Sequence, residues 1–284
     1  MLVGPLYSAE FGNSERETLV LLHGGGASRW VWNPVAAELM DEFHLLVPDL
    51  LEHGRSGGTF SIRHNAELVA ELIALRGHGA KAHVVGLSIG AQIGLELLAH
   101  FPQSVSSALL SSPLTQRIPG LALLSDARWD RAARALMSRY MRGRTYAPLV
   151  RANQRALSIP ARYYPELLED TARLSLDGFM RMMRENLNYR CPDALERVQV
   201  PTLLTVSSAE PPAIGRSVDQ VAARIPGARA VNVPGAVHNW NLQKPELYAQ
   251  TVRTWIREQS WPAELEQRPT SRGSKAQETP KPGR

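Results

Sequence analysis

One short segment constrains the fold of this chain more than any other. Residues 83–94 are predicted to form a buried strand that runs straight into a helix, and the turn between them is Gly86-Leu87-Ser88-Ile89-Gly90. In this G-x-S-x-G pattern the glycines allow neighbouring backbone to close around a strained, exposed serine. The segment therefore predicts a sharp turn that places Ser88 at the top of a sheet.

The same turn would bring together two groups that acyl-transfer chemistry needs. Ser88 Oγ would be an exposed nucleophile, and the Ile89 N–H would lie at a helix N-terminus, where unpaired donors and the helix dipole favour negative charge. Three fixed letters in five residues also recur by chance, and a glycine-rich turn with a solvated serine fits them too. The strand before and the helix after favour the catalytic interpretation.

Apolar runs and helical segments alternate over much of the chain. After short edge strands within residues 2–11, buried strands are predicted at 19–22, 44–50, 84–87, 106–112, 201–206 and 228–233. Helices are predicted at 27–40, 62–76 and 245–258. Such alternation is typical of an α/β fold with a mostly parallel sheet, helices on both faces, and ligands beyond the carboxyl ends of the strands.

The alternation is interrupted once, which indicates an insertion. Residues 114–192 contain no convincing strand but several helical segments, and we interpret them as an inserted helical cap. Residues 1–113 and 193–261 would form the core, and 284 residues with 44% apolar content suffice for one large domain. Residues 262–284 are rich in Pro, Gly, Ser and charge, so we expect them to be disordered.

Composition also limits the compartment and the partners. A single cysteine, Cys191, excludes an intramolecular disulfide and fits a reducing compartment, so we expect a cytoplasmic protein. Neither a signal peptide nor an apolar run of about 18 residues is present, and no membrane partner is expected. Most of the net charge of +5 comes from the C-terminal segment, and no basic stripe with aromatics predicts nucleic-acid binding. The oligomeric state stays open.

A serine nucleophile needs a base and a group that orients the base, and the chain offers one good candidate for each. Glu210 follows the strand that ends at Val206, and His238 follows the strand that ends at Val233. The order Ser, acid, His differs from that of chymotrypsin-like and subtilisin-like enzymes. Asp219 is a weaker alternative for the acid, because it falls inside the next predicted helix.

These motifs resemble the α/β-hydrolase superfamily, in its capped branch, over residues 6–260. His23-Gly24-Gly25-Gly26 is similar to the H-G-G loop of that superfamily, in which the third residue gives an oxyanion-hole N–H. Asp49 with His53-Gly54-Arg55-Ser56 is similar to its D-x-x-G-H-G-x-S loop. The resemblance implies an α/β-hydrolase fold, a catalytic triad of Ser88, Glu210 and His238, and an oxyanion hole made by the N–H groups of Gly25 and Ile89.

The chain departs from the superfamily pattern at three places. Many members have Asp where Glu210 stands, Leu51-Glu52 replaces the usual Pro-Gly before His53, and Leu87 precedes the serine where many esterases have another residue. The second change suggests a loop of different shape. Dehalogenases and epoxide hydrolases of this fold need an aspartate where this chain has Ser88, so the sequence argues against those activities.

Residues for substrate binding are predicted around the nucleophile and in the cap. We expect contacts from Gly26, Leu87, Phe179, Met180, Met183 and Trp240. A methionine stripe is more often core, but flexible thioethers facing Ser88 would suit a loosely shaped apolar group. The histidines show no metal-ligand spacing and the glycine loop no nucleotide-binding spacing, so neither a metal nor another cofactor is expected.

The predicted function is a serine hydrolase that cleaves a carboxylic ester of a small or medium apolar substrate through an acyl-enzyme. A thioesterase, a lactonase or a carbon–carbon bond hydrolase could use the same triad. A ligand receptor or regulatory protein that keeps the catalytic groups is a further alternative. The sequence does not distinguish these substrates, because specificity depends on side-chain directions in the cap and loops.

Overall fold

The described strands form one sheet. The computed structural model describes residues 1–116, 135, 146–156 and 159–269, in which the strands are β1 (Leu2–Val3), β2 (Leu6–Phe11), β3 (Thr18–Leu22), β4 (His44–Pro48), β5 (Ala82–Leu87), β6 (Val105–Ser111), β7 (Thr202–Ser207), β8 (Arg229–Val233) and β9 (Glu266–Gln267). Their order is β1-β2-β4-β3-β5-β6-β7-β8-β9. Neighbours from β4 to β8 are parallel, and the pairs at both ends are antiparallel. The predicted mostly parallel sheet is confirmed.

Helices follow most of the parallel strands. They are α1 (Asn33–Leu39), α2 (Ile62–Arg76), α3 (Ile89–His100), α5 (Tyr146–Ala156), α6 (Tyr164–Arg173), α7 (Leu176–Asn188), α8 (Pro212–Arg224), α9 (Trp240–Gln243) and α10 (Pro245–Glu258). Short 3-10 helices occur at Arg29–Trp32, His78–Ala80, Pro102–Ser104, Ala161–Tyr163 and Asp193–Arg197. The helix predicted at 27–40 is thus divided, and Pro34 lies in the first turn of α1, where its missing N–H costs no hydrogen bond.

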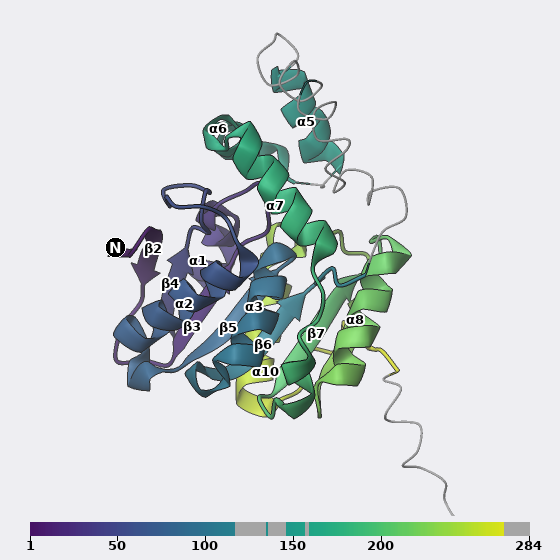
Figure 1. The fold of residues 1–284 in the computed structure, drawn as a ribbon. Helices are drawn as coiled ribbons and strands as arrows, with labels where there is room; N and C mark the ends of the chain where they lie inside the picture. Colours follow the sequence, from purple (N-terminus) through teal and green to yellow (C-terminus); the bar gives the residue numbers. More distant parts are fainter. Residues whose placement is uncertain (117–134, 136–145, 157–158, 270–284) are drawn as a thin grey trace, which may run out of the picture.

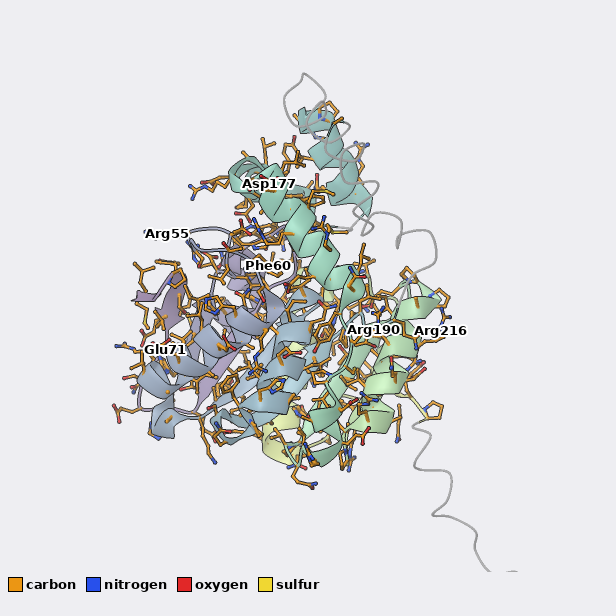
Figure 2. The ribbon with its side chains drawn as sticks, in the orientation of Figure 1. Arg55, Phe60, Glu71, Asp177, Arg190 and Arg216 are labelled. Atoms are coloured by element: carbon orange, nitrogen blue, oxygen red, sulfur yellow. The ribbon has the colours of Figure 1, made fainter. Side chains whose placement is uncertain are left out.

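Both faces of the sheet are covered, which explains why its strands are apolar throughout. In β3, Val20 and Leu22 belong to an apolar cluster with α2, α3 and α8, whereas Leu19 and Leu21 belong to a second cluster with α1 and α10. Successive side chains of a strand point to opposite faces, so a strand between two helical layers has no polar side. Exposed Glu71 on α2 and Arg216 on α8 lie on the outer side of these helices (Figure 2).

The inserted segment brings helices to one end of the sheet. Figure 1 shows α5, α6 and α7, which we call the cap helices, together above that end. They fall within the insertion predicted at 114–192, but residues 117–134, 136–145 and 157–158 of it lie outside the described residues. The boundaries of the predicted cap therefore stay a prediction.

The predicted start of C-terminal disorder needs a correction. Residues 262–269 pack on the core: Leu265 is buried, β9 pairs with β8, and Arg268 donates to Asp219 and Asn232. One apolar side chain and an edge strand suffice to hold this short stretch, although its composition is polar. Residues 270–284 lie outside the described residues, and their predicted disorder stays a prediction.

No helix among the described residues is long and apolar enough to cross a membrane.

Candidate active site

The turn after β5 holds Ser88 in a strained conformation. Ser88 has φ +56° and ψ −116°, and it directly precedes α3. A Cβ at position 86 would come within 2.5 Å of the Gly90 carbonyl oxygen, and one at position 90 would overlap the carbonyl of Leu22. Both glycines of the motif are therefore required by close backbone approach, as predicted. The strain is maintained by packing and by the hydrogen bond from Ser88 N to Ser111 O at 2.8 Å.

A carboxylate and an imidazole meet beyond the ends of β7 and β8. His238 Nδ1 donates to Glu210 Oε1 at 2.6 Å, and His238 lines the same cavity as Ser88. The second oxygen, Oε2, accepts from Ser112 Oγ at 2.6 Å and from Ser207 N at 2.8 Å. With Nδ1 engaged, Nε2 of His238 is the nitrogen left to exchange a proton with a hydroxyl group.

The environment of Glu210 favours its charged form. Its side chain is only 3% exposed, and burial alone would raise the pKa of this carboxyl. The hydrogen bonds and charge of His238, followed by the bonds from Ser112 and Ser207, outweigh burial and hold the pKa of Glu210 below its usual value. A charged acceptor can fix the orientation of His238 and stabilise its protonated form.

Asp219, the alternative acid, lies elsewhere. Its two oxygens accept from Arg268 at 2.9 Å and 2.8 Å on the surface of α8, and nearly half of its side chain is exposed. It does not line the cavity that Ser88 and His238 share. The geometry therefore favours Glu210.

The glycine loop after β3 lies against the serine turn. Gly24, Gly25 and Gly26 all line the cavity with Ser88 and Ile89. A Cβ on Gly25 would come within 2.5 Å of Ile89 Cδ1 and 2.6 Å of Met182 Sδ, so glycine allows this close approach. The Gly26 N–H donates to His53 Nε2 at 3.1 Å, so this N–H is already used in a hydrogen bond within the protein. Gly25 and Ile89 thus lie close together in the cavity wall beside Ser88, and the predicted oxyanion hole stays a prediction.

Two buried histidines shape this loop as neutral side chains. His23 Nδ1 donates to Gly24 O and its Nε2 accepts from Leu50 N, while His53 Nδ1 donates to Leu51 O and its Nε2 accepts from Gly26 N. Burial, aided by the neighbouring His53, lowers the pKa of His23 to about 3, and burial also lowers the pKa of His53. Each ring therefore links two backbone segments without carrying charge.

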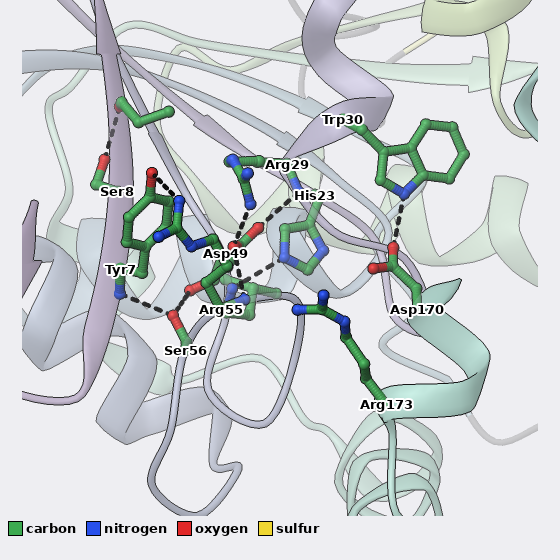
Figure 3. A network of polar contacts seen from close by, with 12 residues as sticks. Tyr7, Ser8, His23, Arg29, Trp30, Asp49, Arg55, Ser56, Asp170 and Arg173 are labelled. Atoms are coloured by element: carbon green, nitrogen blue, oxygen red, sulfur yellow. Dashed lines mark hydrogen bonds and ion pairs between the residues drawn. The ribbon is translucent and has the colours of Figure 1, made fainter. Parts of the chain in front are cut away.

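The loop after β4 is fixed by a buried carboxylate and by an unusual glutamate. Asp49 accepts from Arg29 N, from the Arg29 guanidinium and from Arg55 N (Figure 3). Glu52, which stands where glycine is usual, keeps a glycine-like φ of +61°. Its Oε2 accepts from Phe60 N at 2.8 Å and Arg181 Nε at 3.1 Å. The loop thus retains a left-handed turn, and the glutamate side chain ties it to α7.

A largely apolar cavity of about 320 Å³ opens above the serine. Ser88 and His238 lie in its wall, together with the glycine loop. Its remaining lining consists of Ala27, Val31, Ile89, Ile159, Leu167, Phe179, Met182, Met183, Asn186 and Asn239. Such a mixture of apolar surface with a few polar groups is typical of small-molecule sites.

One face of α7 supplies much of that lining. Phe179, Met182, Met183 and Asn186 recur at i, i+3, i+4 and i+7, which places them along one side of a helix. The predicted contacts of Phe179 and Met183 agree with this face. Met180 requires a correction: it is buried but does not line the cavity, because one residue turns the helix by about 100°.

Two further predicted substrate contacts are corrected. Leu87 packs in the apolar cluster on the α1 and α10 face, because alternation along β5 points it away from the cavity. Trp240 is fully buried, with its ring centroid 4.1 Å from that of Tyr248. Gly26, in contrast, lines the cavity as expected.

Sequence reasoning missed several residues of the site. Met182 and Asn186 could have been found by extending the helical spacing from Phe179. Ser112, which donates to Glu210, gave no motif, although it follows β6 at the same end of the sheet. Ile159 and Leu167 come from the cap helices or the segment between them, where sequence spacing does not define direction.

A second cavity of about 350 Å³ lies next to the first and is lined mainly by charged side chains. It is bounded by Arg29, Trp30, Arg55, Glu166, Glu169, Asp170 and Arg173, among others. Trp30 Nε1 donates to Asp170 Oδ2 at 2.6 Å and links the core to α6 (Figure 3). Burial raises the pKa of Asp170 to about 6, although the bond from Trp30 acts in the opposite direction. Among the described residues, no cluster of His, Cys, Asp and Glu suited to a metal occurs.

Known proteins resemble this chain over most of its length. An AB hydrolase superfamily protein of Gibberella zeae is 28% identical over 88% of this chain and 83% of its own length. A putative carbamate hydrolase of a Caulobacter species is 22% identical, covering 86% of this chain and 91% of the relative. A thermophilic esterase from Thermogutta terrifontis has a similar fold, with a TM-score of 0.70, 20% identity, and coverage of 89% of this chain and 93% of that one.

A further solved structure and a family model agree with this likeness. The enol-lactonase from Burkholderia xenovorans also shares the fold, with a TM-score of 0.71, 19% identity, and coverage of 89% and 96% of the two chains. The model of the alpha/beta hydrolase family matches residues 19–251, which include every residue of the site described above. The chain therefore belongs to the alpha/beta hydrolase family.

Proposed function

We propose that the protein is a serine hydrolase that cleaves a carboxylic ester of a small or medium, largely apolar substrate. The observation that carries this proposal is the 2.6 Å contact between Glu210 and His238 beside the cavity that also exposes Ser88. A buried, charged acceptor, an oriented imidazole and a hydroxyl group at the end of a shared sheet form the arrangement that nucleophilic acyl transfer requires.

The proposed reaction passes through an acyl-enzyme. His238 Nε2 takes the proton of Ser88 Oγ, and Oγ attacks the ester carbonyl carbon. The resulting oxyanion accepts from the N–H groups of Gly25 and Ile89, and its collapse expels the alcohol with the proton from His238. Water then gives its proton to His238 and attacks the acyl carbon, and the acid leaves as Ser88 regains its proton.

The shape and polarity of the cavity support an ester of modest size. Its apolar walls favour a hydrocarbon chain or ring, and a volume of about 320 Å³ lies at the lower end of ordinary ligand sites. Relatives named as an esterase, an enol-lactonase and a putative carbamate hydrolase also support a hydrolase that acts on small molecules.

A substrate screen with covalent labelling tests the proposal. The purified protein is assayed on esters, thioesters and lactones with acyl chains of graded length, and a fluorophosphonate probe is mapped by mass spectrometry. We expect fastest turnover of short or medium esters and labelling at Ser88. Faster turnover of thioesters or lactones would move the function to those classes, and labelling at another serine would overturn the proposed nucleophile. Slow single turnover of every compound would instead indicate a ligand receptor.

A further inference from the structure

Asn186 places an amide in an otherwise largely apolar part of the cavity wall. It lies on the same face of α7 as Phe179, Met182 and Met183, all of which carry apolar side chains. The other amide of the wall, Asn239, is next to His238 and only 8% exposed. Asn186 is thus the amide that the cap side of the cavity presents to a substrate.

Hydrogen bonds fix which way the Asn186 amide points. Gln92 is fully buried on α3, and its terminal Nε2 is 2.6 Å from the carbonyl oxygen of Leu114 and 3.2 Å from the backbone carbonyl oxygen of Asn186. Carbonyl oxygens only accept, so the Gln92 atom beside them must be the nitrogen. This orientation holds even though Gln92 Oε1 finds no partner among the described residues.

The orientation of Gln92 determines that of Asn186 in turn. Gln92 Nε2 also lies 2.9 Å from the side-chain oxygen of Asn186, and two facing NH₂ groups would repel each other. Asn186 must therefore turn its Oδ1 toward Gln92, which leaves Nδ2 as the opposite end of the amide. The described residues offer Nδ2 no acceptor, and the cavity is the space that Asn186 lines.

A donor in this position discriminates between substrates. In the empty cavity water can accept from Nδ2, but a hydrocarbon that displaces the water leaves a buried donor unsatisfied, which is unfavourable. A substrate with an oxygen at the same place replaces the lost hydrogen bond. Sites built to bond a polar group of the substrate reject analogues that lack it.

We propose that Asn186 is a specificity-determining residue that selects apolar esters carrying a second oxygen acceptor, such as an ether or carbonyl oxygen, in the part of the molecule that fills the cavity. This inference rests on the proposed esterase function and deepens it. Gln92 is the positioning residue, because it holds the acceptor end of Asn186 away from the substrate.

The test uses esters that differ only in one oxygen. One series consists of p-nitrophenyl hexanoate and the isomers in which an ether oxygen replaces the methylene group at position 3, 4 or 5. A second series consists of hexyl acetate and its corresponding ether analogues in the alcohol chain. For each, kcat/KM is measured with the wild type and with Asn186→Leu, Asn186→Asp and Asn188→Leu. Comparing variants on the same substrate cancels its intrinsic reactivity.

We expect one ether isomer to lose about 10-fold more kcat/KM in Asn186→Leu than its hydrocarbon parent loses, which corresponds to one hydrogen bond. Asn186→Asp keeps an oxygen toward Gln92 but turns an acceptor into the cavity. It should therefore lower the ratio of kcat/KM for that ether isomer to kcat/KM for its hydrocarbon parent at least as much as Asn186→Leu does. Asn188 is exposed on α7 and donates to Arg184 O, so Asn188→Leu should leave the ratio unchanged.

The outcomes separate this inference from the proposed function. If the wild type hydrolyses no ester of either series, the esterase function fails. If it hydrolyses them but Asn186→Leu and Asn186→Asp lower every ether and its parent by the same factor, only the role of Asn186 is overturned. A ratio that changes equally in Asn188→Leu would likewise overturn it, since that change does not touch the cavity.

Discussion

Two cavities of similar volume lie side by side between the core and the cap helices, and their chemistry is opposite. The cavity above Ser88 is lined mainly by apolar side chains, whereas charged side chains make up most of the lining of its neighbour. Residues that are neighbours in the sequence line different cavities. Ala27 and Leu167 line the apolar cavity, whereas Ser28 and Glu166, next to them in the chain, line the charged one.

The difference teaches that volume alone does not mark the reactive site. In the charged cavity Asp170 accepts from Trp30, Glu166 Oε2 is buried without a partner among the described residues, and no histidine stands in the lining to activate a hydroxyl group. In the apolar cavity the titratable residue of the lining is His238, which donates to the carboxylate of Glu210 behind it. The pKa shifts also differ in sign, since the pKa of the Glu210 carboxyl is lowered and the pKa of the Asp170 carboxyl is raised.

The largest expected effect comes from the serine of the apolar cavity, with the serine of the charged cavity as its control. Ser88→Ala removes the proposed nucleophile and should lower kcat for p-nitrophenyl butyrate by at least about 10³-fold. Ser28→Ala, a matched change in the charged cavity, should alter kcat less than about threefold. Unchanged circular dichroism in both variants would exclude unfolding. Turnover retained by Ser88→Ala would show that the distinction between the cavities is wrong.

The acid of the proposed triad should have the next largest effect. Glu210→Gln keeps the size of the side chain but removes the charge that orients and stabilises protonated His238, so kcat should fall about 10²- to 10⁴-fold. Asp219→Asn breaks only a surface ion pair with Arg268 and should leave kcat within about twofold. Steady-state kinetics on one ester compare the two variants. A loss of kcat in Asp219→Asn alone would reverse the assignment of the acid.

A smaller effect is expected where the glycine loop meets the cavity. In Gly25→Ala the new methyl group would press on Ile89 Cδ1 and Met182 Sδ, which are flexible ends that can move. The displaced loop should bring its N–H group out of line and lower kcat about 10-fold, with a smaller change in KM. Normal kcat together with a raised KM would mean that position 25 limits substrate binding and not oxyanion stabilisation.

The thermal stability of the protein should depend on pH through Asp170 in the charged cavity. The folded state holds a proton on Asp170 up to about pH 6, above the usual range for an aspartate, so the stabilising effect of that proton is present in acid and lost as pH rises through 6. Asp170→Asn resembles the protonated form and can still accept from Trp30. Its Tm should match that of the wild type near pH 4 and exceed it by about 2–4 °C at pH 7.5. Equal Tm values at both pH values would contradict this.

The fold was largely predictable, because its signals are local and repeated. Apolar strands buried on both faces have a simple pattern, and the glycines around Ser88 are imposed by backbone contact. Glu210 and His238 could be proposed because parallel strands end at one edge of the sheet. Which face of α7 lines the cavity could not, since helical spacing groups Phe179, Met182 and Asn186 on one face but does not say what that face packs against.

Interactions between distant residues were also beyond sequence reasoning. Arg268 pairs with Asp219 although it falls in a segment whose composition predicts disorder, and a strand of two residues has no periodicity to detect. The glutamate at position 52 suggested a loop of different shape. In the structure its backbone keeps the left-handed turn, and its carboxylate accepts from Phe60 and Arg181. Such contacts depend on tertiary structure, which one sequence does not encode as a local pattern.

The face of α7 that lines the cavity, formed by Phe179, Met182, Met183 and Asn186, has a consequence for how this protein can evolve. Four positions of α7 line the cavity, whereas Ser88 and His238 lie on other segments, so a point substitution at one of the four need not displace them. An inserted or deleted residue between Phe179 and Asn186 would instead rotate one end of this face by about 100° relative to the other and turn charged neighbours such as Arg184 toward the cavity. New substrate preferences can therefore arise by small steps in side chains, whereas changes in the length of this helix should be eliminated by selection.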